Sequence, residues 1–187
     1  MRIIAGTAQG AKLTVPRGKG IRPTSDRVRE AIFQVIGDRV IGARGLDLYA
    51  GAGGLGLEAL SRGAAHMVFV DQAWAAVSFI RKSLGRLDFG GQAWVERKEV
   101  FRFLRKGVRQ GVSFDLVFAD PPYRQNTLQD LLMLLDQGQL VAEPGLVIIE
   151  IAKWRVPPPQ VAGFSMVWQR VYGDTQVVFW EKVKSER

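Results

Sequence analysis

Residues 46–58 read LDLYAGAGGLGLE, and the class of fold follows from this stretch. The apolar residues before Tyr49 predict a buried strand, and the residues after Gly53 predict the start of a helix. Gly51, Gly53 and Gly56 have the G-x-G-x-x-G spacing, in which the missing side chains allow a tight turn and a close approach to a ligand. The stretch therefore predicts a strand–turn–helix unit with a ligand at the turn.

The chain after residue 42 alternates strand-like and helix-like segments. Strands are expected near 44–49, 67–71, 93–97, 114–119 and 146–151, and helices near 54–62, 73–87, 99–107 and 126–137. Two further β-like runs, 164–171 and 175–183, predict an antiparallel hairpin at the sheet edge. This alternation predicts a Rossmann-like α/β domain, whose mostly parallel sheet is covered by helices on both faces.

The first 40 residues form an extension of a single domain, 1–187, whose core spans 41–187. Residues 1–16 suggest a hairpin with a turn near Gln9 and Gly10. Thr24 or Ser25 is a candidate N-cap for a helix that ends near Ile36.

Asp120, Pro121, Pro122 and Tyr123 directly follow the apolar run 114–119. The carboxylate can accept a hydrogen bond from an amino group, and the two prolines stiffen the loop. Tyr123 can stack on a flat heterocycle. The motif predicts a site that holds a planar amino group for alkylation, although a proline-rich turn with a surface aromatic residue also fits it.

Asp71 follows the next strand about 20 residues after the glycine turn, where an acid suits a ribose diol. A nicotinamide dinucleotide would fit this pattern as well. Asp47, however, precedes the glycines, where its charge would oppose a pyrophosphate and favour the sulfonium and ammonium of S-adenosylmethionine. The strand before Asp120 is fourth in the series, which places it beside the first if the strand order reverses there.

These motifs together resemble the RsmD family of small-subunit ribosomal RNA guanine-N2 methyltransferases. The matching residues are RIIAG at 2–6, RPTSDRVREAIF at 22–33, LDLYAGAG at 46–53, LEALSRGA at 57–64, DPPY at 120–123 and YGDT at 172–175. The chain has Glu99 and Gln34 where the family usually has Asp and Asn. The resemblance implies an S-adenosylmethionine-dependent methyltransferase fold with a seven-stranded sheet and transfer of a methyl group to guanine N2 in 16S ribosomal RNA.

The resemblance also implies roles for individual residues. Asp120, Pro121, Pro122 and Tyr123 would hold the target amino group and stack on its base. The cofactor would be bound by Asp47, Tyr49, Ala50, Gly51, Gly53, Asp71, Gln72, Glu99 and Val100. Asp47 could instead satisfy loop amides, Asp71 could cap the next helix, and Glu99 could cap the helix that follows it.

The chain of 187 residues is basic, with a net charge of +8, which favours a polyanionic partner. Basic residues gather in 1–22 and 97–109. RNA contacts are expected from Arg2, Lys12, Arg17, Lys19, Arg22, Thr24, Arg27 and Arg29, although the last helix positions could simply face solvent. The expected partner is 16S ribosomal RNA within a 30S subunit or an assembly intermediate.

Several classes of function lack support in the sequence. There is no cysteine, so thiol catalysis and cysteine-based zinc sites are excluded, and no residue pattern predicts a metal or a covalent nucleophile. No apolar run approaches the roughly 18 residues of a membrane span. We expect a cytoplasmic monomer, and we expect the five tryptophans to pack in the core or at sheet edges.

Three alternatives stay open. The same Asp-Pro-Pro-Tyr site serves methylation of adenine N6 or cytosine N4 in DNA or RNA. A nicotinamide-dependent oxidoreductase would share the glycine turn. A non-catalytic RNA-binding module would keep the basic residues with a relic pocket.

Overall fold

The computed structural model describes residues 1–13, 15, 25–106, 112–121 and 127–183. The strands are β1 (Arg44–Leu48), β2 (His66–Asp71), β3 (Ala93–Arg97), β4 (Phe114–Ala119), β5 (Val141–Ala152), β6 (Gln160–Val161), β7 (Phe164–Tyr172) and β8 (Thr175–Lys182). The helices are α1 (Asp26–Ile36), α2 (Gly54–Ser61), α3 (Trp74–Arg86), α4 (Val100–Lys106) and α5 (Thr127–Gln137), with short 3-10 turns at Gly37–Val40 and Gly90–Gln92. The predicted alternation of strands and helices is confirmed.

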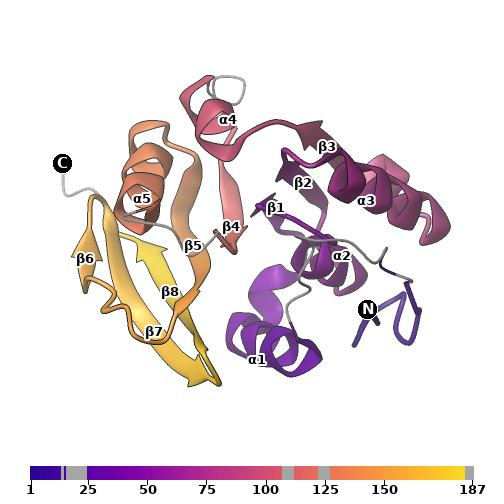
Figure 1. Cartoon of the computed structure of the whole chain (residues 1–187), viewed down its shortest axis with the longest axis horizontal. Helices are drawn as coiled ribbons and strands as arrows, with labels where there is room; N and C mark the ends of the chain where they lie inside the picture. Colours follow the sequence, from indigo (N-terminus) through magenta and orange to yellow (C-terminus); the bar gives the residue numbers. More distant parts are fainter. Residues whose placement is uncertain (14, 16–24, 107–111, 122–126, 184–187) are drawn as a thin grey trace.

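The strands form one sheet in the order β3-β2-β1-β4-β5-β8-β7-β6. Strands β1 to β5 pair in parallel, and β8 runs antiparallel to β5. The strand order reverses between β1 and β4, which are direct neighbours, so the condition under which the sequence places Asp120 beside the first strand is met. Figure 1 shows β5 and the C-terminal hairpin on the other side of β4 from β1 and β2. The segments that follow β1 and β4 therefore meet at one edge of the sheet, where ligands of such folds bind.

Helices cover both faces of the sheet. Apolar residues of α1, α2 and α3 pack on one face, for example Phe33, Leu57 and Ile80, while those of α4 and α5 pack on the other, for example Phe103 and Leu131. The interior strands are buried on both sides, which explains their continuous apolar sequence.

The sheet differs from the prediction in two places. It has eight strands rather than seven, because the two-residue β6 pairs with β7 at the far edge. A pair of residues is too short to produce a recognisable alternation of apolar and polar positions. Strand β5 begins at Val141 rather than 146, since Val141 pairs with Phe114 before the register shifts at Leu116.

The N-terminal residues form the predicted hairpin as far as they are described. Arg2 pairs with Lys12, and the amide of Ile3 donates to the carbonyl of Ala11. Helix α1 begins as expected, with the Ser25 hydroxyl accepting from the amide of Val28 at 3.3 Å. The other candidate cap, Thr24, lies outside the described residues.

Buried Glu58 of α2 anchors this arm to the core. Its two carboxylate oxygens accept from the amides of Ile4 and Ala5 at 2.8 and 3.0 Å. They also pair with Arg62 at 2.8 Å and Arg29 at 3.6 Å, and the side chains of Glu58 and Arg29 are fully buried. The arm is thus part of the fold, held by a cluster of buried charges.

Two of the tryptophans do not behave as predicted. Trp180 is fully buried and Trp168 packs edge-on against Phe179, but Trp74, Trp94 and Trp154 are 60%, 62% and 69% exposed. Trp94 lies on edge strand β3, as expected. The expectation was wrong for Trp74 and Trp154, because apolar character alone does not decide which side of an element faces solvent. Within the described part of the chain, no helix is both long and apolar enough to cross a bilayer.

Candidate active site

The glycine turn lies between β1 and α2. Gly51 and Gly53 have left-handed backbone angles, φ +55° and +70°, which disfavour a side chain. Among the described residues, a Cβ built on Gly51 would meet only the Tyr49 carbonyl oxygen, at 3.8 Å. The turn therefore leaves open space above Gly51, into which a ligand can come close to the backbone.

Gly56 has a different role from Gly51. A Cβ at Gly56 would lie 2.2 Å from a ring carbon of buried Phe69. This glycine lets α2 pack closely on β2, which is the role expected for the third glycine of the motif.

Asp47 lies beneath the turn rather than in it. Its side chain is buried and its Oδ2 accepts from the amide of Gly56 at 3.0 Å. Asp47 therefore satisfies a backbone amide, as one of its two predicted roles required, although this amide belongs to the first turn of α2 rather than to the loop. Burial raises the pKa of Asp47 to about 8, against the Gly56 hydrogen bond, and the charges of Asp71 and Asp120 raise it further.

Asp71 joins the turn to the next helix. One carboxylate oxygen accepts from the amide of Gly51 and the other from the amide of Ala73, both at 2.8 Å. The contact with Gly51 brings the acid predicted for the ribose against the glycine turn. The contact with Ala73 forms a turn just before α3, whose N-cap residue is Ala73 and whose first turn receives no side-chain cap, so the alternative that Asp71 caps this helix is not borne out.

The loop before α4 reaches the same place. Glu99 accepts from the amides of Phe101 and Arg102 at 2.8 and 2.7 Å, so it caps α4 as the alternative interpretation held. Burial raises the pKa of Tyr49 to about 12, helped by the charge of Glu99. Tyr49, Glu99 and buried Val100 therefore lie on one side of the glycine turn.

Asp120 follows β4 at the level of Tyr49, because Ala119 pairs with Leu48 across the two strands. The side chain of Asp120 is half-buried and Pro121 is buried. The structure thus brings the first half of the proline motif to the glycine turn, while Pro122 and Tyr123 lie outside the described residues. Among the predicted cofactor residues, Ala50 is buried in the turn and Gln72 is exposed beyond Asp71.

The result is an acidic site in a basic protein. Asp47, Asp71, Glu99 and Asp120 surround the glycine turn, and the influence of Asp71 and Asp120 on Asp47 shows how near they are. Across the described ranges, no group of three or more such side chains is arranged to hold a metal ion.

The predicted RNA contacts divide into three groups. Arg2, Lys12 and Arg27 are exposed and available to a phosphate. The prediction is wrong for Arg29, which is fully buried and donates to the carbonyl of Arg2 and, at 2.9 Å, to Asp26. Arg17, Lys19, Arg22 and Thr24 lie outside the described residues.

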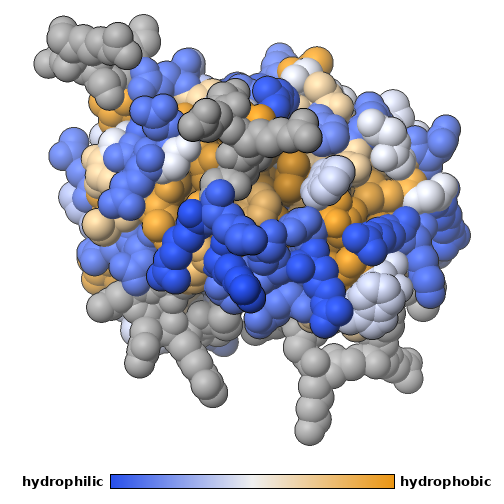
Figure 2. All heavy atoms as spheres, turned by 90° about the horizontal axis from the view of Figure 1, so that it is seen from above, coloured by the Kyte–Doolittle hydropathy of each residue, from blue (hydrophilic) through white to orange (hydrophobic). Residues whose placement is uncertain are grey.

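Exposed basic residues also lie on α4. Arg102, Arg105 and Lys106 face solvent, in line with the basic cluster of 97–109. Seen from above, on the side where α4 lies in Figure 1, a dense group of hydrophilic side chains crosses the face in front of apolar ones (Figure 2).

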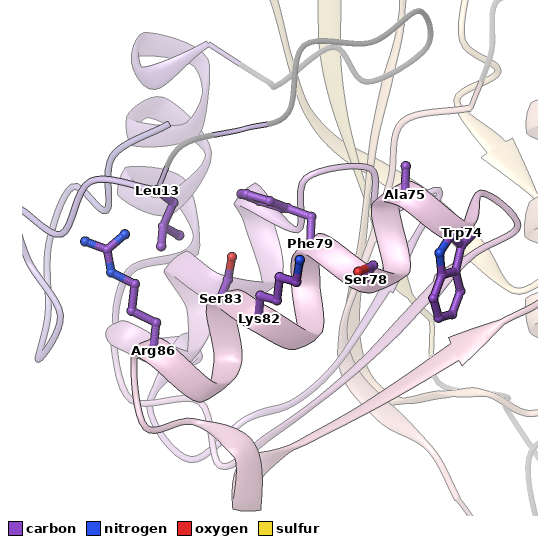
Figure 3. Close-up of a pocket in the computed structure, with 8 residues that line it drawn as sticks. All are labelled: Leu13, Trp74, Ala75, Ser78, Phe79, Lys82, Ser83 and Arg86. Carbon is purple, nitrogen blue, oxygen red and sulfur yellow. The ribbon is translucent and has the colours of Figure 1, made fainter.

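A groove of about 490 Å³ runs along the outer side of α3. It extends from Trp74 past Ser78 and Lys82 to Arg86, with Leu13 of the N-terminal arm above it (Figure 3). None of the residues that line it belongs to the glycine turn, so it is separate from the predicted cofactor site. Its two basic side chains make it part of the positively charged surface.

Sequence reasoning missed two exposed tryptophans at the carboxyl edge of the sheet. Trp74 follows β2 and lies 5.9 Å below the guanidinium of Arg97, and Trp154 follows β5 and lies 5.1 Å from that of Arg155. The available signal was a tryptophan a few residues after a buried strand, a position where loops face a ligand.

Comparison with known proteins identifies close relatives. The family model described as Conserved hypothetical protein 95 matches residues 1–181. YlbH of Bacillus subtilis (strain 168), a candidate rRNA methyltransferase, is 38% identical over 97% of this chain and 99% of its own length. The ribosomal RNA small subunit methyltransferase D of Escherichia coli (strain K12) is 36% identical over 92% of this chain and 85% of that enzyme.

Solved structures show the same fold. The candidate methyltransferase yhhF from Escherichia coli has a TM-score of 0.87 and 34% identity, and the match covers 98% of both chains. An RNA methyltransferase from Salinibacter ruber, solved with S-adenosyl-L-homocysteine, has a TM-score of 0.67 at 14% identity and covers 89% of this chain and 97% of that one. At that identity the second likeness shows the fold alone.

Proposed function

The chain belongs to the Conserved hypothetical protein 95 family, and from this premise we propose that it transfers a methyl group from S-adenosylmethionine to guanine N2 in 16S ribosomal RNA. Its relative in Escherichia coli is named as a small-subunit ribosomal RNA methyltransferase, which supports the class of reaction and of substrate. The choice of guanine N2 comes from the resemblance of the whole set of motifs.

The acidic surroundings of the glycine turn carry the proposal. Asp47 is buried below the turn, and Asp71 and Asp120 lie near enough to raise its pKa. A dinucleotide would bring its pyrophosphate toward the charges of Asp71 and Asp120, and like charges repel. A sulfonium and an ammonium would relieve that repulsion, so the site favours S-adenosylmethionine over a nicotinamide dinucleotide.

The residues present fit this cofactor. We propose that the methionine part lies against Gly51 and that Asp71, at the end of β2, accepts from the ribose hydroxyls; the near-absence of contacts at Gly51 among the described residues and the closeness of Asp71 to the turn support this. Val100, at the start of α4, offers an apolar surface for the adenine. Each oxygen of Glu99 accepts one amide hydrogen bond, as each oxygen of Asp71 does, and a carboxylate oxygen keeps a further lone pair for a ligand donor. When bound, the cofactor supplies an electrophilic methyl group.

Asp120 and the carbonyl of Pro121 are proposed to accept hydrogen bonds from the two amino hydrogens of the target guanine. The lone pair of this nitrogen is delocalised into the ring, so the amino group is a weak nucleophile. Two fixed acceptors would favour the pyramidal geometry in which the nitrogen attacks the methyl carbon. Positioning and electrostatics then account for most of the rate enhancement. Tyr123 is proposed to stack on the base, which must be unpaired or flipped out.

The substrate is proposed to be RNA in a 30S subunit or an assembly intermediate, bound by a monomer in the cytoplasm. The net charge of +8 and the exposed Arg2, Lys12 and Arg27 support a polyanionic substrate. The groove along α3, with Lys82 and Arg86, adds to this basic surface.

Methyl transfer from labelled S-adenosylmethionine to small subunits that lack their native modifications tests the proposal. N2-methylguanosine at one position is expected on nucleoside analysis. N6-methyladenosine or N4-methylcytosine would overturn the choice of base. A tightly bound nicotinamide dinucleotide in the purified protein, found by mass spectrometry, would overturn the reaction class.

Asp120→Ala is expected to abolish transfer while leaving the affinity for S-adenosylhomocysteine within a few-fold. Asp115→Ala is the matched control, because Asp115 lies at the opposite end of β4, where it accepts from the amide of Arg44 at 2.8 Å. Equal loss of activity in both variants would indicate damage to β4 rather than a role for Asp120 in the reaction.

A further inference from the structure

We propose that Trp154 and Arg155 form a stacking platform for an RNA base next to the target nucleotide. This inference rests on the proposed function and adds a substrate contact to it. The platform consists of an indole ring with a guanidinium 5.1 Å from its centre, in the loop that follows β5.

The register of the sheet places this loop beside the site. Ala119 pairs with Ile149, so Asp120 is level with Glu150, one strand away. Trp154 is four residues further along, and residues span at most about 3.6 Å each while neighbouring strands lie about 4.8 Å apart. The Cα atoms of Asp120 and Trp154 are therefore within roughly 15 Å of each other. The loop after β5 thus lies on one side of β4. The glycine turn and Asp71, which follow β1 and β2, lie on the other side (Figure 1).

The loop after β5 exposes large apolar side chains to solvent, and this exposure does not stabilise the fold. Trp154 is 69% exposed and Val156 is 92% exposed. A tryptophan in water loses the stabilisation that burial of its large ring would provide. Exposed aromatic residues in a fixed position are typical of binding surfaces.

Buried polar groups hold the loop in place. The side-chain amide of Gln176, which is 4% exposed, donates to the carbonyl of Ala152 at 3.2 Å and to that of Arg155. The indole of Trp180 donates to the carbonyl of Pro158 at 3.2 Å. A loop with these anchors and three consecutive prolines at 157–159 is ordered before it binds, so binding costs little conformational entropy.

The chemistry of the pair favours RNA over an apolar partner. Unpaired bases stack on tryptophan rings and on arginine planes, and arginine also binds phosphate with its forked donors. Lys153 adds a positive charge, although it is paired with Asp174 at 2.6 Å. The comparable pair, Trp74 and Arg97, lies on the cofactor side, after β2 and β3, and so does not face the target base.

The test compares Trp154→Ala, Trp154→Phe and Trp94→Ala for binding to the undermodified small subunit and for methyl transfer. Trp94 is the matched control, because it is 62% exposed but lies in the middle of edge strand β3. Loss of one base–aromatic stack costs about 1–3 kcal/mol, which is roughly a 5- to 150-fold loss of affinity. Trp154→Ala is expected to raise the Kd by this factor with unchanged affinity for S-adenosylhomocysteine. Trp154→Phe should restore most of the affinity.

The possible outcomes separate the inference from the proposed function. If the wild-type protein methylates the subunit and the variants Trp154→Ala and Trp94→Ala bind the subunit with equal affinity, the stacking platform is overturned and the proposed function stands. A wild-type protein that neither binds nor methylates the subunit would overturn both. Ultraviolet crosslinking of the bound complex should join the Trp154 peptide to a nucleotide, and a crosslink to a ribosomal protein instead would replace RNA with a protein partner.

Discussion

Replacing Glu58 by glutamine is expected to detach the N-terminal arm and to destabilise the fold strongly. The carboxylate accepts from the amides of Ile4 and Ala5 and pairs with Arg62 and Arg29. A glutamine of the same size offers one acceptor where the carboxylate offers two charged oxygens, and its NH₂ group faces other donors.

The magnitude follows from the burial of the cluster. Removing one partner of a buried ion pair costs about 3–5 kcal/mol, because the other charge is left without compensation. The side chains of Glu58 and Arg29 are fully buried, so this range applies here, and the loss should lie toward its lower end because Arg29 keeps its ion pair with Asp26 at 2.9 Å. Since domains are stable by about 5–15 kcal/mol, the variant should still fold but with a much smaller margin.

Denaturant unfolding and amide hydrogen exchange measure the effect. The free energy of unfolding should fall by about 3–5 kcal/mol. Exchange should accelerate at Ile3 and Ala8, whose amides donate to Ala11 and Ser61. Glu181→Gln is the control, because its ion pair with Arg39, also at 2.8 Å, is exposed and should contribute less than about 1 kcal/mol. A loss below about 1 kcal/mol for Glu58→Gln, with unchanged exchange in the arm, would refute the role of the buried cluster.

Three further predictions concern the glycine turn, buried Asp47 and the N-terminal arm. Gly56→Ala should lower the free energy of unfolding by about 1–3 kcal/mol and weaken cofactor binding, because its methyl group would lie 2.2 Å from Phe69. The control Gly85→Ala, whose methyl group meets no atom of the described residues within 4 Å, should be neutral or slightly stabilising in thermal unfolding. Because the pKa of Asp47 is raised from 3.8 to about 8, its contribution to stability is full below pH 4 and is lost as the pH rises through 8, by up to about 6 kcal/mol. Asp47→Asn should remove this fall in urea titrations between pH 4 and 9, and parallel curves for variant and wild type would contradict it. Replacing both Arg2 and Lys12 by glutamine should reduce the slope of log Kd for RNA against log salt by roughly 1.4–1.8, and an unchanged slope would exclude phosphate contacts there.

Local sequence patterns determined most of the fold. The glycine turn at 51–56 and the alternation of strands and helices predicted the parallel sheet, because these signals depend on residues close together in the chain. The position of Asp120 beside the turn also followed from the sequence, since a fourth strand placed next to the first brings the two loops together. The short β6 and the early start of β5 were missed because neither has a periodic pattern.

The surroundings of individual side chains were decided only by the tertiary structure. Arg29 was expected to contact RNA but is buried against Glu58, 29 residues away in the sequence. The raised pKa of Asp47 depends on its burial and on Asp71 and Asp120, which three different strands bring together. The exposure of Trp154 depends on Gln176 of β8, whose amide holds the loop. A sequence determines spacing along the chain and therefore the elements, whereas burial and charge pairing depend on which distant segments pack together, and so only the folded chain reveals them.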